Sequence, residues 1–202
     1  MSGIDSLDKL TQMIARLPGI GGRSAMRIAL YLFDSDDEYL SELSNSILSL
    51  HKNIKLCREC YSLSENDICN ICASDKRDRT KLCVVESYTD MIAIEKTEEY
   101  NGLYHVLGGL IEPLKGIGIS DIRIKELIDR VKDNSSIEEI IIAFGASLEA
   151  DTTASYINKT LRNNNFDKKI SRITYGISLA SDIENADSRS LARSIADRVV
   201  MQ

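Results

Sequence analysis

The sequence predicts an α/β protein with a helical N-terminal region, a small cysteine-rich module and a mostly parallel β-sheet flanked by helices. Three observations carry this prediction. Apolar residues recur at helical spacing before residue 55, two Cys-x-x-Cys pairs follow, and short β-rich runs then alternate with helical stretches. Alternation of this last kind is typical of a parallel sheet, because each strand needs a crossover connection to reach the next one.

The N-terminal region is expected to hold three helices. The first carries an apolar stripe and has to stop at Pro18-Gly19, because proline disfavours helical backbone in the residue before it. The second is expected from about residue 23 to 33, and the third from about 37 to 51. The stripe residues are Leu7, Leu10, Ile14 and Leu17 in the first helix, and Leu40, Leu43, Ile47 and Leu50 in the third.

The cysteine segment, residues 57–72, is short and polar, and we expect it to be loop-like. Beyond it the pattern predicts strands at 82–86, 104–107, 140–144 and 170–175, with helices near 89–97, 121–132 and 150–163. A last helix around Leu191 and Ile195 closes the chain, after a solvated loop and helix cap at Asp182, Glu184 and Asp187.

Composition and charge limit the classes of function that this chain can have. With 43% hydrophobic residues the chain can bury a core, and its net charge of −6 argues against a generally basic nucleic-acid binder. Residues 1–33 nevertheless balance to +2, whereas residues 84–202 balance to −5. Any DNA contact is therefore expected near the front of the chain. The opening residues lack a signal-peptide pattern and no apolar run spans a bilayer, so we expect a cytoplasmic protein without membrane contact.

A glycine-rich turn, Leu17–Ala25, joins the first two helices. Its glycines (Gly19, Gly21 and Gly22) let the backbone turn tightly while Ile20 packs inward. The second helix would then open with free N–H groups that suit a phosphate, and Arg23 and Arg27 would add charge beside it. An ordinary helix–helix turn is the alternative, but the full pattern favours binding to the DNA backbone without sequence preference.

The spacing Cys57-x-x-Cys60 and Cys69-x-x-Cys72 is the strongest signal in the chain. Two such pairs complete the tetrahedron that Zn²⁺ accepts, and an all-sulfur site leaves no position for a reactive water. We therefore predict one structural zinc; a redox dithiol or an iron–sulfur cluster are the alternatives. Cys83, at an expected strand start, is interpreted as a buried apolar residue.

Carboxylates follow two of the predicted strands. Glu86 and Asp90 come after the first, and Glu149 and Asp151 come after the third. Ligands bind at the carboxyl ends of parallel strands, and an all-oxygen set suits Mg²⁺. Taken alone, the simpler interpretation is that Asp90 and Asp151 stabilise helix starts. No Tyr, His or Lys is clearly placed as a nucleophile or base, and His51 and His105 are interpreted as structural.

The order of these features resembles the RecR family of recombination mediators over essentially the whole chain. The turn resembles a helix-hairpin-helix motif, and the α/β body resembles a Toprim domain. The matching stretches are 17–25, 57–72, 83–95, 107–118 and 149–157. The resemblance divides the chain into a helix-hairpin-helix domain (1–55), a zinc finger (56–73), a Toprim-like domain (80–176) and a C-terminal tail with a helix (177–202).

The resemblance implies a non-enzymatic mediator of bacterial recombinational repair, associated with the nucleoid. Such proteins bind single- and double-stranded DNA, form homodimers or homotetrameric rings, and act with RecO-like and RecF-like proteins. Together they help to load recombinase on gapped DNA coated by single-strand-binding protein. In the family, the positions of Arg23 and Arg27 contact DNA, and those of the four cysteines bind zinc. The acidic positions at Glu86, Asp90, Glu149 and Asp151 are linked to partner binding and to Mg²⁺.

Three stretches depart from the family pattern. Glu149-Ala150-Asp151 stands where Glu-Gly-Glu is usual, Gly145-Ala146 replaces Asn-Pro, and Ser178–Ser181 replaces Pro-Val-Gly-Gly. The last change puts a nucleotide- or partner-binding role of the tail in doubt. Two other function classes stay open: a Mg²⁺-dependent Toprim enzyme of the nuclease or primase type, and an assembly factor that binds only protein. For the mediator we expect no catalytic residue.

Overall fold

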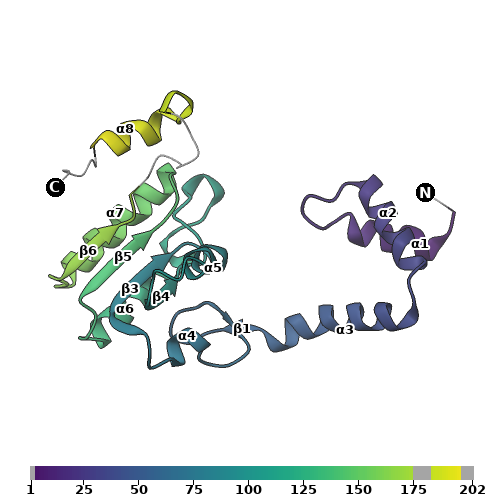
Figure 1. Ribbon diagram of the computed structural model, residues 1–202, viewed down its shortest axis with the longest axis horizontal. Coiled ribbons are helices and arrows are strands. Elements are labelled where there is room, and N and C mark those ends of the chain that lie inside the picture. Colours follow the sequence, from purple (N-terminus) through teal and green to yellow (C-terminus); the bar gives the residue numbers. More distant parts are fainter. Residues whose placement is uncertain (1–2, 175–182, 197–202) are drawn as a thin grey trace. The chain divides into compact units, whose positions relative to one another are not determined.

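A computed structural model describes residues 3–174 and 183–196 (Figure 1). Contacts within the chain divide it into two compact units, residues 1–54 and residues 55–202. Each unit has its own packing, and each is described by itself.

The N-terminal unit is built from three helices, α1 (Asp5–Ile14), α2 (Gly22–Phe33) and α3 (Asp37–Asn53). They confirm the helices expected from the apolar periodicity to within a few residues. Helices α1 and α2 pack through Ile14 against Ala25 and Ala29. The two alanines are fully buried, and their small side chains let the two helices approach closely.

Helix α3 begins at a capped residue, because the Asp36 side chain accepts a hydrogen bond from the Tyr39 amide at 2.7 Å. None of its described side chains is buried, although the helix carries the predicted apolar stripe. Ile47 and Leu50 are 63% and 64% exposed. Within the N-terminal unit, the second half of this apolar stripe is therefore uncovered.

The cysteine segment holds more regular structure than expected. A two-stranded antiparallel ribbon pairs β1 (Lys55–Leu56) with β2 (Leu63–Ser64), and a single helical turn, α4 (Asn70–Ala73), follows. Elements this short escape the periodicity argument, which needs longer windows. We call residues 55–74 the knuckle.

The body is a four-stranded parallel sheet in the order β4-β3-β5-β6. Its strands are β3 (Asp78–Val85), β4 (Gly102–Val106), β5 (Glu139–Ala143) and β6 (Lys169–Arg172). The parallel sheet confirms the predicted fold class. Strand β3 starts four residues before the predicted position, in a stretch whose charged side chains conceal it.

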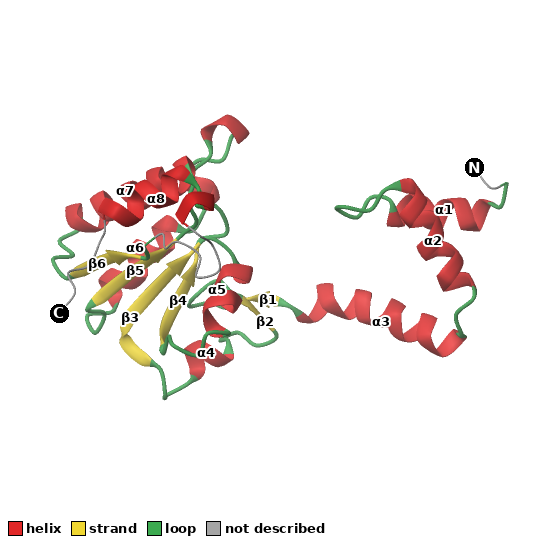
Figure 2. Cartoon of the chain, turned by 45° about the horizontal axis from the view of Figure 1, so that its top comes forward, coloured by secondary structure: helices red, strands yellow, loops and turns green. Residues whose placement is uncertain are grey.

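Helices cover both faces of this sheet (Figure 2). Helices α6 (Ile124–Asp133) and α7 (Leu148–Asn163) cover one face, over a core that includes Leu82, Val84 and Ile140. Helix α5 (Tyr88–Glu95) covers the other face, over Cys83, Val85 and Tyr104. Alternate residues of β3, β4 and β5 thus enter opposite cores, as the pleat requires.

The strand order places a topological switch beside the central strand. From β3 the chain moves outward to β4, and it then crosses back to add β5 and β6 on the other side. The connections after β3 and β5 leave toward opposite faces, so their carboxyl ends border the crevice in which ligands of parallel sheets usually bind.

Short 3₁₀ turns at Pro113–Lys115, Ile119–Asp121 and Ile183–Asn185 and a last helix, α8 (Ser188–Ala196), complete the described elements. The side chain of Asp187 accepts a hydrogen bond from the Ser190 amide at 2.9 Å, which confirms the predicted cap. Tyr175, Asp182 and the atypical stretch Ser178–Ser181 lie outside the described residues. Among the helices that the structure describes, none combines the length and apolarity needed to cross a membrane.

Candidate metal centre and nucleic-acid interface

The four cysteines of the knuckle meet at one point. Their sulfur atoms all lie within 4.8 Å of one another, and all four residues are buried. Cys57 and Cys60 lie in the turn between β1 and β2, Cys69 caps the start of α4, and Cys72 lies inside that turn of helix. The structure thus brings together the residues that the spacing predicted, in a set of thiols without a disulfide.

The arrangement fits a tetrahedral zinc ion. A tetrahedron with Zn–S bonds of about 2.3 Å separates its sulfurs by about 3.8 Å. The sulfurs of Cys60 and Cys69 are 3.6 Å apart. The amides of Cys69 and Cys72 point at the sulfurs of Cys57 and Cys69, at 3.3 and 3.4 Å. Such N–H groups stabilise the negative charge that zinc-bound thiolates carry.

The protonation of these thiols shows why a cation suits the site. Contact with the Cys60 thiol holds the pKa of Cys69 far below its usual range. Contact with Cys69 raises the pKa of Cys60 to about 12, and contact with Cys60 raises that of Cys72 well above its usual range. Negative charge on one of these three sulfurs therefore opposes ionisation of its neighbours, and a divalent ion would offset that repulsion.

The glycine turn of the N-terminal unit has the geometry that a phosphate site needs. Gly19 lies at φ +77°, a conformation that disfavours other residues, and Gly21 is the extended residue before α2. Ile20 packs against the α1–α2 core, as predicted. No side chain caps the start of α2, so the amides of its first turn face outward with the positive end of the helix dipole.

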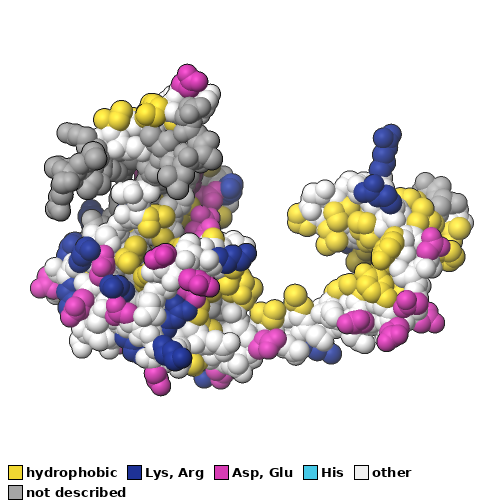
Figure 3. All heavy atoms as spheres, in the orientation of Figure 1, with side chains coloured by type: hydrophobic (Ala, Val, Ile, Leu, Met, Phe, Trp, Pro, Cys, Tyr) yellow, Lys and Arg dark blue, Asp and Glu magenta, His cyan; other side chains and the backbone are white. Residues whose placement is uncertain are grey.

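Arg23 and Arg27 lie one helical turn apart on α2, and both are exposed. Neither forms an ion pair with a carboxylate of the described residues. The space-filling view shows basic side chains projecting from one side of this unit, while apolar side chains cover much of the rest (Figure 3). Two such guanidinium groups beside an open helix start can hold adjacent phosphates of a nucleic-acid backbone.

The acidic residues lie at the carboxyl end of the sheet, where the sequence predicted them. Glu86 directly follows β3, and Asp90 takes part in a reciprocal cap with Ser87 at the start of α5. Glu149 and Asp151 lie in the first turn of α7. The cap role of Asp90 agrees with the simpler interpretation made from the sequence.

These carboxylates do not converge on one point. Within the described residues, the knuckle cysteines are the only group of three or more ligand-type side chains whose donor atoms lie within 4.8 Å. Asp151 is paired with Arg172. The structure therefore gives no support to the predicted Mg²⁺ site.

Sequence reasoning missed two residues at this edge. Glu112 and Lys115 lie in the loop after β4 and form an ion pair with each other. Burial, followed by repulsion from Asp90 and Glu112, raises the pKa of Glu86. The three-residue spacing between Glu112 and Lys115 was the available signal for their pairing. Their proximity to Glu86 depends on the fold. We call Glu86, Asp90, Glu112 and Glu149 the acidic edge.

Two remaining predictions concern single residues. Cys83 is 3% exposed and lies in the core under α5, as predicted; burial raises the pKa of its thiol to about 12. His105 is fully buried in the sheet and donates from Nε2 to the Arg123 carbonyl oxygen at 2.9 Å. Its buried position agrees with the structural role expected for it.

The fold and its centres define a class: a helix-hairpin-helix protein with a four-cysteine metal module and a Toprim-like sheet. Family models match three parts of the chain: the RecR helix-hairpin-helix at residues 7–51, the RecR four-cysteine zinc finger domain at 54–74 and the Toprim domain at 80–174. The chain belongs to the RecR family of recombination proteins.

Relatives match the chain over nearly its full length. The Recombination protein RecR of Brachyspira hyodysenteriae is 77% identical over 201 residues, which cover 100% of both chains. That of Phocaeicola vulgatus is 40% identical over 96% of this chain and 93% of its own. The Recombination protein RecR of Bdellovibrio bacteriovorus is 41% identical over 98% of this chain and 99% of its own.

Proposed function

We propose that the chain is a non-enzymatic DNA-binding mediator of bacterial recombinational repair. In this role it acts on the chromosome with RecO-like and RecF-like proteins to load recombinase on gapped DNA coated by single-strand-binding protein. One observation carries the proposal: an open helix start flanked by two exposed arginines, in a chain that belongs to the RecR family. The proposal includes four domains: a helix-hairpin-helix domain (1–55), a zinc finger (56–73), a Toprim-like domain (80–176) and a C-terminal tail with a helix (177–202).

DNA binding is expected to read phosphates and not bases. The amides of Gly22 and Arg23 and the side chains of Arg23 and Arg27 offer donors and charge, which suit single and double strands alike. The test is fluorescence anisotropy with labelled oligonucleotides at low salt. Arg23→Ala/Arg27→Ala should weaken binding at least tenfold.

A charge-matched control accompanies this test. Lys125→Ala/Lys159→Ala removes two positive charges from exposed positions of the body, and it should leave affinity close to that of the wild type. Equal affinity of a folded Arg23→Ala/Arg27→Ala variant would contradict the proposed interface. It would favour the alternative of an assembly factor that binds only protein.

The metal of the knuckle is proposed to be one structural Zn²⁺ per chain, held by Cys57, Cys60, Cys69 and Cys72. Elemental analysis should find one zinc per purified wild-type chain, and Cys57→Ala should lose it. Cys83→Ala is the matched control, since it removes another buried thiol outside the cluster. A metal content unchanged by Cys57→Ala would contradict the assignment.

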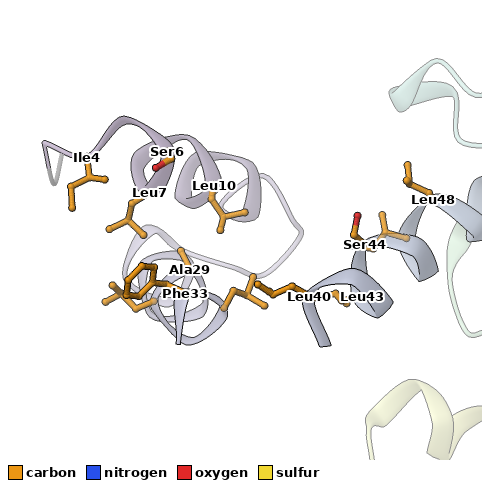
Figure 4. Close-up of a pocket in the computed structure, with 13 residues that line it drawn as sticks. Ile4, Ser6, Leu7, Leu10, Ala29, Phe33, Leu40, Leu43, Ser44 and Leu48 are labelled. Atoms are coloured by element: carbon orange, nitrogen blue, oxygen red, sulfur yellow. The ribbon is translucent and has the colours of Figure 1, made fainter. Parts of the chain in front are cut away.

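Self-association is proposed to cover the apolar face of the N-terminal unit. Side chains of α1, α2 and α3 line a groove of about 630 Å³ (Figure 4). Ile4, Leu10 and Phe33 lie along it and are 57%, 38% and 79% exposed. A second copy carries the same apolar helices, so a symmetric pairing buries both faces at once and supports a homodimer or a homotetrameric ring.

Light scattering tests this assembly. Phe33→Glu/Ile47→Glu places two charges in the groove and should lower the mass in solution, with unchanged helicity by circular dichroism. Leu114→Glu, at a fully exposed position of the body, should leave the mass unchanged. An unaltered mass of the groove variant would place the subunit interface elsewhere.

The acidic edge is proposed as the surface for a RecO-like partner and not as a catalytic centre. Leu114 and Leu148 expose apolar side chains beside its carboxylates, at 101% and 74% exposure, and this mixture is typical of protein interfaces. Glu86→Gln/Glu149→Gln should weaken capture of a purified RecO-like protein, whereas Asp129→Asn/Asp133→Asn on α6 should not.

A Mg²⁺-dependent nuclease or primase remains the competing function, because the Toprim fold hosts such enzymes. Phosphoryl transfer requires bound metal and an activated nucleophile. Labelled single- and double-stranded DNA incubated with Mg²⁺ or Mn²⁺ distinguishes the two functions. A mobility shift without cleavage is expected; metal-dependent cleavage that is lost in Glu86→Gln would favour the enzyme.

A further inference from the structure

Tyr61, directly after a cysteine of the metal cluster, adopts a backbone conformation that ordinarily favours glycine. Its φ is +62°, in the left-handed region. Its amide donates to the Cys57 carbonyl oxygen at 2.9 Å, which closes the turn that holds the first cysteine pair. Glycine would adopt this turn without steric cost, so the tyrosine side chain has to contribute something that offsets the strain.

The ring of Tyr61 packs on two residues of the body. It meets the His105 ring edge-on: the ring centroids are 5.5 Å apart, and the angle between the ring planes is 65°. The Arg123 guanidinium carbon lies 5.3 Å from the centroid of the same ring. These two residues are hydrogen-bonded to each other, because His105 Nε2 donates to the Arg123 carbonyl oxygen. One knuckle residue therefore contacts two linked residues of the body.

The backbone beside Tyr61 continues this connection. The carbonyl oxygen of Cys60 accepts a hydrogen bond from the Val106 amide at 2.8 Å, at the end of β4. The next two amides bond to the end of β3: Leu107 to the Val85 oxygen at 3.0 Å, and Gly108 to the Glu86 oxygen at 2.9 Å. Consecutive hydrogen bonds thus lead from a metal ligand to the first residue of the acidic edge.

Arg123 holds the same loop from its other side. Its amide and its Nη1 both donate to the Leu107 oxygen, at 3.0 and 3.3 Å. A Cβ on Gly108 would lie 2.2 Å from that Nη1, so the guanidinium occupies the space beside the glycine. The loop then runs on to Glu112, which is held in a small hairpin by two hydrogen bonds with Ile117.

We propose that Tyr61 locks the knuckle onto the sheet, and that the metal centre thereby fixes the loop of residues 107–118 and the acidic edge. Zinc would then control a surface that contains none of its ligands. The proposal does not require a particular partner, so it can fail or succeed independently of the function proposed above.

The simplest competing account is that Tyr61 only closes a turn. Tyr61→Gly separates the two accounts, because glycine relieves the backbone strain and removes the ring. If the ring is a lock, amide hydrogen exchange in residues 107–118 should accelerate at least tenfold, with unchanged exchange in α7. If the turn alone matters, exchange in 107–118 should stay the same or slow, and that result would overturn the proposal.

Two further samples complete the experiment. Tyr61→Phe keeps the ring and should exchange like the wild type. Wild type stripped of zinc by a chelator should show the same selective acceleration in residues 107–118 as Tyr61→Gly; unchanged exchange there would also overturn the proposal. Should Tyr61→Gly fail to fold, Tyr61→Asn removes the ring and keeps a residue type that tolerates left-handed backbone, while Arg123 stays in place; the same acceleration is expected and the same contrary result would overturn the proposal.

Discussion

Arg77 and Glu95 form a two-pronged ion pair at the edge where the knuckle meets the sheet. Both side chains are largely covered, at 17% and 22% exposure. The Tyr104 hydroxyl donates to the same carboxylate at 2.7 Å. Burial opposes the charge on Glu95, but the hydrogen bonds from Arg77 and Tyr104 prevail and hold its pKa below the usual value. This pair joins the start of β3 to the end of α5.

Removing Glu95 should destabilise the body strongly. Glu95→Ala leaves a largely covered guanidinium and a tyrosine hydroxyl without their acceptor, which should cost about 3 kcal/mol in the free energy of unfolding. Urea denaturation of the zinc-loaded protein measures this cost. The control is Asp67→Ala, whose pairs with Lys55 and Arg58 are exposed to solvent, so its loss should be much smaller. Similar losses in both variants would contradict the importance of the covered pair.

DNA affinity should depend steeply on salt, and Arg23 and Arg27 should account for part of that dependence. Each phosphate contact releases counterions, so Arg23→Ala/Arg27→Ala should reduce the slope of log affinity against log salt by about 2 on duplex DNA. Anisotropy titrations over a range of salt concentrations measure the slope. A variant with weaker binding and an unchanged slope would show that these arginines do not contact phosphates.

Stability should fall as pH falls from about 6.5 to 4, because of His105. Burial lowers the pKa of His105 to about 4, and its Nδ1 has no hydrogen-bond partner among the described residues. The unfolded chain binds a proton at pH 5 that the folded chain does not, so unfolding is favoured as pH drops through this window. The loss between pH 7 and 5 should be about 2 kcal/mol.

Urea unfolding at pH 7 and pH 5 checks this effect, with zinc bound in both samples. His105→Gln keeps a donor for the Arg123 oxygen and removes the titrating ring. Between pH 7 and pH 5 the variant should therefore lose about 2 kcal/mol less unfolding free energy than the wild type. Parallel pH profiles of the two proteins would mean that His105 does not titrate in this way.

Gly108 should tolerate a side chain less well than Gly116. Both have positive φ, +82° and +75°, so alanine strains the backbone at either position, by about 1 kcal/mol. Only at Gly108 would the added Cβ also meet the Arg123 guanidinium, whereas at Gly116 it points into open space. Thermal unfolding should therefore show Gly108→Ala to be less stable than Gly116→Ala by about a further 1 kcal/mol, because Arg123 has to give up its side-chain hydrogen bond to Leu107 when it moves aside. Equal melting temperatures would argue that Arg123 moves aside freely.

Features whose parts lie close together along the chain could be predicted from residue order alone. Four cysteines within sixteen residues, Cys57 to Cys72, have to meet if each pair holds the same ion, and Gly19, Gly21 and Arg23 form one turn and one helix start. The alternation of strands and helices likewise predicted a parallel sheet. Local backbone geometry decides such features, so spacing and residue type were sufficient.

Which distant residues share a surface became evident from the folded chain. The order β4-β3-β5-β6 brings Glu112 and Lys115 to Glu86 and pairs Asp151 with Arg172. The same packing places Tyr61 against His105 and Arg123. Residue spacing could not predict these contacts, because strand order and side-chain direction depend on packing between distant segments.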